Sequence, residues 1–209
     1  DSPFVRFMDF DWTWKLCRIS SHAVVGNQVL KDRVAPLMGA DAVTIVPTCI
    51  DMDKHAQKMY PARGPEEPVV LGWTGLADNL GYMQIIEPIL QDLAKKHRIK
   101  LLIATGKDYH LEGVEVENRR WRMEGEIAYL QDPDIGLMPL KDTPRARGKC
   151  AFKALQYMGV GTPCVISPVG MNAEVIQDGV DGYLADTPEE WREKLEHLIR
   201  DAAARERMG

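Results

Sequence analysis

From about residue 69 onward, short apolar runs alternate with longer segments in which apolar residues recur every three to four positions. The short runs have the length and composition of strands, and the longer segments have the period of amphipathic helices. In the clearest helical segment, 79–97, Met83, Ile86 and Leu90 fall on one face. We expect strands at 69–74, 100–105, 113–116, 135–138, 163–166 and 182–185, and helices at 79–97, 124–130, 149–158, 173–177 and from 188 toward 207, the last capped by Thr187.

Strands that are short and continuously apolar belong to sheets covered on both faces. Because strands and helices alternate, the pattern predicts an α/β fold with a Rossmann-like, doubly wound parallel sheet. Sheets of this kind bind ligands at the carboxyl ends of their strands. We therefore expect the chemistry of this chain in the loops after Thr74, Thr105, Met138 and Ile166.

The N-terminal quarter has a different pattern. Residues 1–18 are rich in aromatic side chains without a clear period, so we expect them to need a partner surface. Asn27 is a residue type that caps the start of a helix, and Gly39 is one that ends it. We expect a short buried strand at 22–26, a helix from Asn27 to about Met38, a second strand at 42–46, and a proline-rich linker or exposed loop at 61–68.

Composition narrows the class of protein. The chain has 209 residues, of which 45% are hydrophobic and 27% charged, as in globular proteins. Its net charge of −5 gives no general attraction to nucleic acid or to anionic membranes. The four cysteines lack metal-ligand spacing, so we expect reduced thiols in or near the core, which fits the cytoplasm. The chain begins with Asp1 instead of Met, and we expect it to be cut from something longer.

Two glycine-bearing loops follow expected strands. In the loop 72–79, Gly75 would let the backbone approach a phosphate, although an ordinary tight turn explains the same glycine. The loop 167–174 carries Gly170 and either contacts a sugar or turns the chain. Neither loop matches a dinucleotide-binding or P-loop motif.

The segment 141–153 contains five basic residues between an expected strand and an expected helix. If that helix begins at Lys149, Lys149 and Lys153 share a face, and the first-turn amides of 149–151 are free donors. Cations near a helix start are unfavourable unless an anion offsets them, and a diphosphate would do so. A solvated basic loop is the alternative.

Trp121 lies among Arg119, Arg120 and Arg122. Its ring could stack on a nucleobase, or it could be a half-buried aromatic under a basic strand. The five histidines are scattered, and none has the spacing of a catalytic triad.

Over roughly residues 20–209, these junctions together resemble glycosyltransferase family 4, in which two Rossmann-like domains form the GT-B fold. The resemblance implies that residues 1–50 are the tail of an N-terminal domain and the interdomain linker, and that 51–209 form the C-terminal, nucleotide-sugar-binding domain. The resemblance is carried by 46–51 (VPTCID), 71–75 (LGWTG), 134–140 (DIGLMPL), 148–167 (GKCAFKALQYMGVGTPCVIS), Gly170, Asn172, Glu174 and 181–184 (DGYL).

In this family the C-terminal domain holds a nucleotide diphosphate-sugar, and the resemblance implies three groups of contacts. No catalytic residue, metal or cofactor is implied. The donor diphosphate would lie at Gly75, Lys149, Cys150, Ala151 and Lys153, the nucleoside at Trp121, Arg122 and Gln156, and the sugar at Gly170, Met171 and Asn172.

The chain departs from the family pattern at three places. The family commonly has two glutamates eight positions apart, where this chain has Gly148 and Gln156. It usually has a lysine after the first glycine loop, where this chain has Asn79-Leu80-Gly81. Gln156 could still bond a ribose hydroxyl, and Lys149 and Lys153 could supply the positive charge.

The resemblance implies the donor-binding part of a retaining glycosyltransferase, which moves a sugar from a nucleotide diphosphate to a glycan, lipid or small-molecule acceptor. We expect this fragment alone to be inactive, because the N-terminal Rossmann domain that supplies the acceptor pocket is missing. Any contact with a membrane surface would be made through that missing half. Two alternatives stay open: a non-catalytic nucleotide-sugar-binding module, and a GT-B epimerase acting on a nucleotide sugar. A NAD-binding domain is disfavoured, because no G-x-G-x-x-G motif is present.

Overall fold

The computed structural model describes residues 12–60, 64 and 66–209. It confirms the predicted α/β fold, with a parallel sheet of six strands in the order β5-β4-β3-β6-β7-β8. Because the chain moves outward in one direction from β3 and in the other from β6, the strand order reverses between these two strands. The strands are β3 (Val69–Thr74), β4 (Ile99–Thr105), β5 (Glu115–Arg120), β6 (Ile135–Met138), β7 (Cys164–Ile166) and β8 (Tyr183–Leu184).

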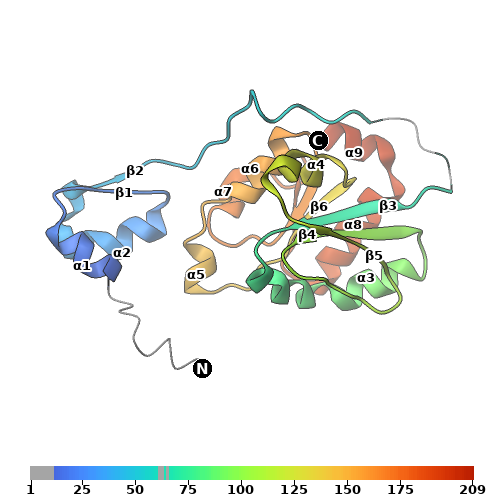
Figure 1. Ribbon diagram of the computed structural model, residues 1–209, viewed down its shortest axis with the longest axis horizontal. Coiled ribbons are helices and arrows are strands. Elements are labelled where there is room, and N and C mark those ends of the chain that lie inside the picture. The colour runs from blue at the N-terminus through green and yellow to red at the C-terminus, as the bar shows by residue number, and fades with distance from the viewer. Residues whose placement is uncertain (1–11, 61–63, 65) are drawn as a thin grey trace.

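Helices cover both faces of this sheet (Figure 1). On one face, Leu71, Leu101 and Leu137 pack into a core with α3 and α8. On the other face, Leu102 packs with Tyr129 of α4, and Ile166 packs with α6. Side chains of successive strand residues point to opposite faces, so continuously apolar strands supply both cores. The helical elements are η3 (Ala77–Ile85), α3 (Glu87–Ala94), η4 (Met123–Gly125), α4 (Glu126–Gln131), α5 (Pro144–Arg147), α6 (Phe152–Gly159), α7 (Asn172–Val175), α8 (Pro188–Arg200) and α9 (Ala202–Met208).

Two expected helices are each divided in two. The segment 79–97 forms η3 and then α3, and Pro88 lies in the first turn of α3. Proline lacks the N–H that a continuous helix would need, so the single helix predicted here is wrong. The last helix is interrupted at Asp201, whose extended backbone ends α8 and whose side chain caps α9.

The N-terminal lobe, residues 12–45, lies beside the sheet domain, touches it at residues 148–150, and is joined to it by an extended segment (Figure 1). Asn27 Oδ1 accepts from Leu30 N at 2.8 Å and Gly39 follows the last helical residue, which confirms the predicted caps. The first helix was not predicted, and the part of the aromatic segment at 1–11 lies outside the described residues. The lobe contains α1 (Trp12–Ile19), β1 (Ala23–Val25), α2 (Gln28–Met38), η2 (Ala40–Ala42) and β2 (Val43–Ile45).

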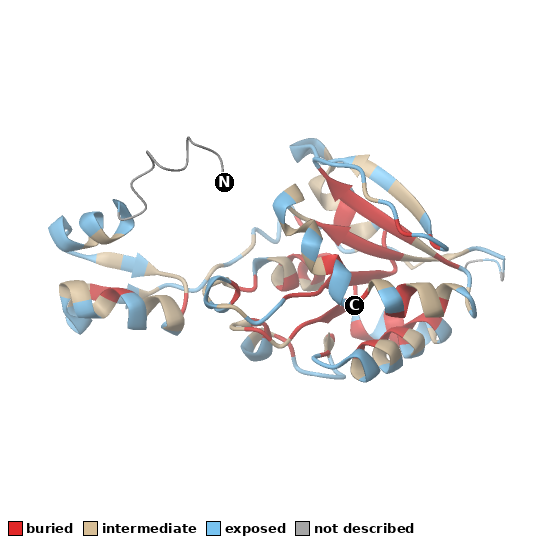
Figure 2. Ribbon diagram, turned by 90° about the horizontal axis from the view of Figure 1, so that it is seen from below, coloured by how far each residue is buried: buried red, intermediate tan, exposed pale blue. Residues whose placement is uncertain are grey.

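The expectation that the first strand is buried is wrong. Val24, at the centre of β1, is 66% exposed. The lobe's sheet consists of β1 and β2 alone, and α2 packs against both strands. Side chains of successive strand residues point to opposite faces, so Val24 lies on the face opposite to that of Ala23 and Val25. Figure 2 shows that buried residues concentrate in the larger domain.

The segment between β2 and β3 forms no helix or strand in its described part. It packs along the end of α6, where Lys58 N donates to Val160 O at 2.8 Å. A Cβ on Gly159 would lie 2.2 Å from Ile50 Cδ1, so a larger residue here would displace the Ile50 side chain. A domain boundary near residue 50 stays a prediction.

The four cysteines form no disulfide. Cys164 is buried, but Cys49 is exposed, so the expectation that all four lie in or near the core is wrong for Cys49. Among the described helices, none has the length and apolarity that a membrane crossing requires.

Candidate functional site

Two adjoining hollows open at the carboxyl ends of β3 and β6, where the strand order reverses. This is the place at which doubly wound sheets bind ligands. We name them the β6 hollow, of about 290 Å³, and the Trp121 hollow, of about 560 Å³; together they form the cleft. Both are lined by Thr74, Gly75, Phe152 and Lys153.

The end of β3 forms part of the wall of both hollows. A Cβ on Gly75 would lie 3.0 Å from the ring of Trp73, so a larger residue here would press against that ring. Gly75 is fixed by Thr105, whose Oγ1 donates to Gly75 O at 2.7 Å. The hydroxyl of Thr74 is buried and has no hydrogen-bond partner among the described residues.

Lys149 and Lys153 both line the β6 hollow. Lys149 Nζ lies 5.0 Å from the ring centroid of Tyr82, which lines the same hollow. Burial lowers the pKa of Lys149, and repulsion from Arg145 lowers it further. Burial also lowers the pKa of Lys153, to about 8, against the opposing attraction of Glu126. Within the described residues neither ammonium forms an ion pair, so both keep their positive charge uncompensated by direct contact.

The predicted start of the helix at Lys149 is wrong. Lys149 lies just after α5, a helix that was not predicted, and its N–H donates to Ala146 O of that helix at 3.0 Å. Ala151 then takes a left-handed conformation, φ 52°, and α6 begins at Phe152. The first-turn amides are therefore those of 152–154 and not of 149–151. Lys149 and Lys153 do not share a helix face; the bend at Ala151 brings both into one hollow instead.

Cys150 and Ala151 differ in their access to the cleft. Cys150 lines the β6 hollow. Ala151 is fully buried and lines neither hollow, because its left-handed backbone turns the chain beneath the surface. A diphosphate contact at Ala151 stays a prediction.

A chain of hydrogen bonds crosses the wall of the Trp121 hollow. Lys153 Nζ donates to Gln156 Oε1 at 2.7 Å, and Gln156 Nε2 donates to Glu126 Oε1 at 2.9 Å. Gln156 is 1% exposed, so its amide group is almost fully occupied by these two neighbours. Sequence reasoning missed Glu126, because it lies 30 residues from Gln156 and only the packing of α4 against α6 brings them together.

Trp121 follows β5 and lines the hollow named after it, together with Gly106 and Leu76. Its side chain is 43% exposed, so one part of the ring is free to contact a ligand. Arg122 is exposed and is not among the lining residues.

The neighbouring arginines are engaged elsewhere. Arg119 pairs with Glu117 and Asp132, and Arg120 pairs with Asp108. These ion pairs give Arg119 and Arg120 a structural role. Trp121 is the residue of this group that lines the cleft.

Residues 68–201 match the sequence model of the family described as glycosyl transferases group 1. The chain belongs to this family. No curated protein sequence matches the chain.

Solved glycosyltransferase structures have the same fold. HepE from Anabaena, in complex with UDP and glucose, is 14% identical with a TM-score of 0.66, and the match covers 92% of this chain and 57% of that one. Sucrose-phosphate synthase from Thermosynechococcus elongatus is 14% identical with a TM-score of 0.67, covering 94% of this chain and 53% of that one. TarM is 9% identical with a TM-score of 0.65, covering 95% and 40%. The chain thus spans about half the length of these structures.

The loop expected to hold the sugar does not line the cleft. Gly170, Met171 and Asn172 are absent from both sets of lining residues. Asn172 is 1% exposed, and its Nδ2 donates to Ser167 O at 2.9 Å. Gly170 has φ 58°, and a Cβ there would meet Arg147 O at 2.7 Å. The structure gives these residues a role in the turn, and sugar binding by them stays a prediction.

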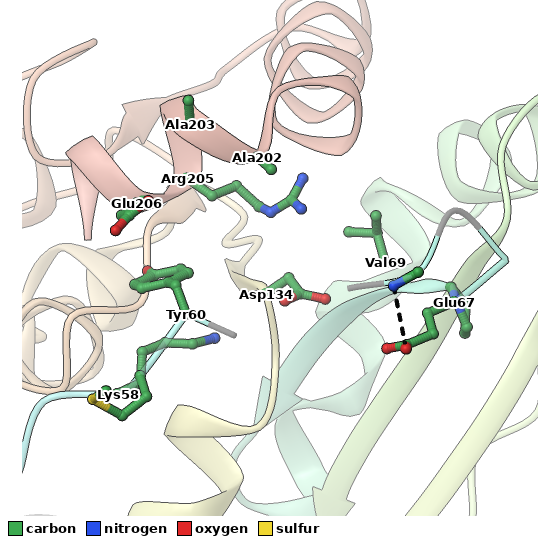
Figure 3. Close-up of a pocket in the computed structure, with 12 residues that line it drawn as sticks. Lys58, Tyr60, Glu67, Val69, Asp134, Ala202, Ala203, Arg205 and Glu206 are labelled. Atoms are coloured by element: carbon green, nitrogen blue, oxygen red, sulfur yellow. Dashed lines mark hydrogen bonds between the residues drawn. The ribbon is translucent and has the colours of Figure 1, made fainter. Parts of the chain in front are cut away.

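The chain has a further cavity of about 460 Å³ at the amino ends of the strands (Figure 3). Tyr60, Asp134 and Arg205 surround it. Arg205 donates to Leu198 O at 2.5 Å and so caps the end of α8, and Tyr60 donates to Gly161 O. These bonds fasten the linker and α9 to the sheet domain, which is a structural role.

Among the described residues, no group of His, Cys, Asp or Glu side chains could hold a metal ion.

Proposed function

We propose that this chain is the donor-binding part of a retaining glycosyltransferase of family 4, which moves a sugar from a nucleotide diphosphate to an acceptor. One observation carries the proposal. The β6 hollow holds the ammonium groups of Lys149 and Lys153, both partly withdrawn from water and without an ion pair within the described residues. Buried charges are costly when uncompensated, so a site of this kind favours an anionic ligand.

The arrangement of the cleft fits the parts of a nucleotide diphosphate. The diphosphate would lie in the β6 hollow, against the two lysines and the first-turn amides of α6. The base would stack on Trp121 in the adjoining hollow. The ribose between them would pass Glu126, whose carboxylate can accept from hydroxyl groups and is held in place by Gln156. The HepE structures with UDP and with UDP-glucose have the same fold, which supports this class of ligand.

In the transfer reaction, the bond between the sugar's anomeric carbon and the diphosphate breaks, and a bond to the acceptor oxygen forms on the same face. The diphosphate leaves with the bonding electron pair, and the acceptor hydroxyl gives its proton to an oxygen of the departing diphosphate. Lys149 and Lys153 would stabilise the departing diphosphate, because preorganised charges lower the energy of the charge that develops. The acceptor pocket would come from a partner domain, so this chain alone would bind without transferring.

A non-catalytic donor-binding module is the second candidate. Gly148 supplies no side chain where the family commonly has a glutamate, and a Cβ there would approach Leu30 Cδ2 at 3.3 Å. A larger residue there would have to displace the Leu30 side chain. The two candidates agree on donor binding and differ in transfer, which an assay with labelled donor and the complete enzyme would separate.

Thermal unfolding of the chain with UDP, GDP, ADP and their glucose conjugates tests donor binding. A ligand that binds only the folded state raises the melting temperature. We expect at least one diphosphate to do so, and Lys149→Ala to weaken its binding by about 1.5–3 kcal/mol, the contribution of a charged hydrogen bond.

Lys141→Ala is the matched control. Lys141 belongs to the same basic segment, but it is exposed and lines neither hollow. It should leave the affinity unchanged at moderate salt. If no diphosphate shifts the melting temperature, or if both lysine variants weaken binding equally, the site is misassigned.

A further inference from the structure

Asn27 joins the N-terminal lobe to the loop that carries Lys149. Its Oδ1 accepts from Leu30 N at 2.8 Å, and its Nδ2 donates to Lys149 O at 3.2 Å. These bonds fix the orientation of the amide group, because a backbone N–H needs an acceptor and a carbonyl needs a donor. Asn27 is 4% exposed, so water competes little for either bond.

The chain around Lys149 is held from both sides. Its N–H donates to Ala146 O at 3.0 Å, and its C=O accepts from Asn27. The following residue, Cys150, packs directly on the lobe, because a Cβ on Gly26 would lie 2.3 Å from Cys150 Sγ.

The next residue, Ala151, is the only described non-glycine residue with a positive φ. A left-handed backbone costs roughly 1–2 kcal/mol in a residue with a side chain, so its surroundings must hold it in place. The contact with the lobe is one of the constraints on this turn. The point from which the Lys149 side chain enters the cleft therefore depends on residues 26 and 27.

We propose that Asn27 is a positioning residue for donor binding: by its bond to the Lys149 carbonyl, it sets where the Lys149 ammonium lies in the β6 hollow. The identity of the ligand rests on the proposed function. The contact between the lobe and the sheet domain is then part of the diphosphate site, and donor affinity depends on it although Asn27 lines neither hollow.

Two substitutions separate this role from helix capping. Ser and Asp cap helices about as well as Asn, so Asn27→Ser and Asn27→Asp keep the start of α2. The serine hydroxyl is too short to span both partners, and the aspartate carboxylate has no hydrogen to donate. Both variants therefore lose the bond to Lys149 O but keep the cap of α2, and UDP affinity is compared at a temperature at which each variant is folded. We expect the affinity for UDP to fall about two- to tenfold, as for one neutral hydrogen bond.

A double-mutant cycle tests whether the effect runs through Lys149. In the Lys149→Ala background, Asn27→Ser should cause no further loss of UDP affinity. Asp201→Ala is the stability control: it removes the cap of α9, at the other end of the sheet domain, and should lower the melting temperature with unchanged UDP affinity.

The inference is overturned if both Asn27 variants bind UDP as tightly as the wild type, or if Asn27→Ser weakens binding equally with and without Lys149. Failure of the proposed function is visible earlier, in the wild type. A wild-type chain that binds none of UDP, GDP and ADP refutes the donor site, and this inference falls with it.

Discussion

The Lys153 ammonium and the Glu126 carboxylate are separated by one amide group, that of Gln156. Lys153 Nζ donates to Gln156 Oε1 at 2.7 Å, and Gln156 Nε2 donates to Glu126 Oε1 at 2.9 Å. The carboxylate therefore attracts the ammonium without neutralising it by contact. Attraction across this distance only partly offsets burial, which is why the pKa of Lys153 falls to about 8.

Donor binding should weaken as the pH rises through about 8, the pKa of Lys153 in the free protein. Below this pH Lys153 carries its charge, and a bound diphosphate raises its pKa, so binding takes up a proton at higher pH. Affinity should fall by roughly half between pH 7 and 8 and then by up to about tenfold for each pH unit. Calorimetry with UDP at pH 7, 8 and 9 measures this dependence.

Lys153→Arg is the control for this pH dependence, because arginine stays charged throughout the range. It should remove the decline between pH 8 and 9 even if its larger head group lowers affinity at pH 7. An equal decline in the wild type and in this variant would show that another group titrates.

Glu126→Gln should move the same decline to a lower pH. Glu126 raises the pKa of Lys153 against the effect of burial. With a neutral residue at 126, burial lowers that pKa further. The amide of Gln156 would still meet an acceptor, because glutamine retains a carbonyl oxygen. The midpoint of the affinity change with pH is the measurement, and an unchanged midpoint contradicts the role of Glu126.

Thr74→Val and Thr105→Val should change stability in opposite directions. Thr74 has a buried hydroxyl without a partner among the described residues, and its removal should stabilise the chain by about 1 kcal/mol. Thr105 Oγ1 donates to Gly75 O at 2.7 Å, and its loss should cost about 1–2 kcal/mol. Denaturant unfolding compares the two substitutions, which remove the same atom. Equal effects would mean that the Thr74 hydroxyl is bonded in solution.

Gly26→Ala should destabilise the contact between the lobe and the sheet domain. The new Cβ would lie 2.3 Å from Cys150 Sγ, and overpacking of this kind costs about 1–3 kcal/mol. Cys150→Ala removes the sulfur, so the double variant should recover most of the loss. The thermal unfolding of the two single variants and the double variant provides the measurement. Full additivity of the two single effects would contradict the direct contact.

Local sequence patterns predicted much of the sheet. The strands at Val69–Thr74 and Ile135–Met138 have their predicted bounds, because a run of apolar residues between turn signals is a local feature. The caps at Asn27 and Thr187 were also predicted, since a capping side chain bonds an amide only a few residues away.

The same approach failed where distant contacts compete with local preference. The basic segment before α6 has no sequence pattern that predicts α5 or the left-handed turn at Ala151. Val24 is apolar, yet it is exposed, because the face of the lobe's sheet is decided by which side α2 covers.

The sequence alone determined that this chain alternates strands and helices, and it predicted ligand-binding loops after four strands, which include β3 and β6. The resemblance to glycosyltransferase family 4 implied that Lys149, Lys153, Trp121 and Gln156 contact one donor, which stays a prediction. Each of these conclusions depends on the order of residues, which a linear pattern records. Tertiary structure decided that the lysines meet across a bend in place of one helix face, that Gln156 is held by Glu126, and that Asn27 holds the Lys149 loop. Those pairings join residues 30 and 122 positions apart, and packing of whole elements, which no local pattern encodes, brings such residues together.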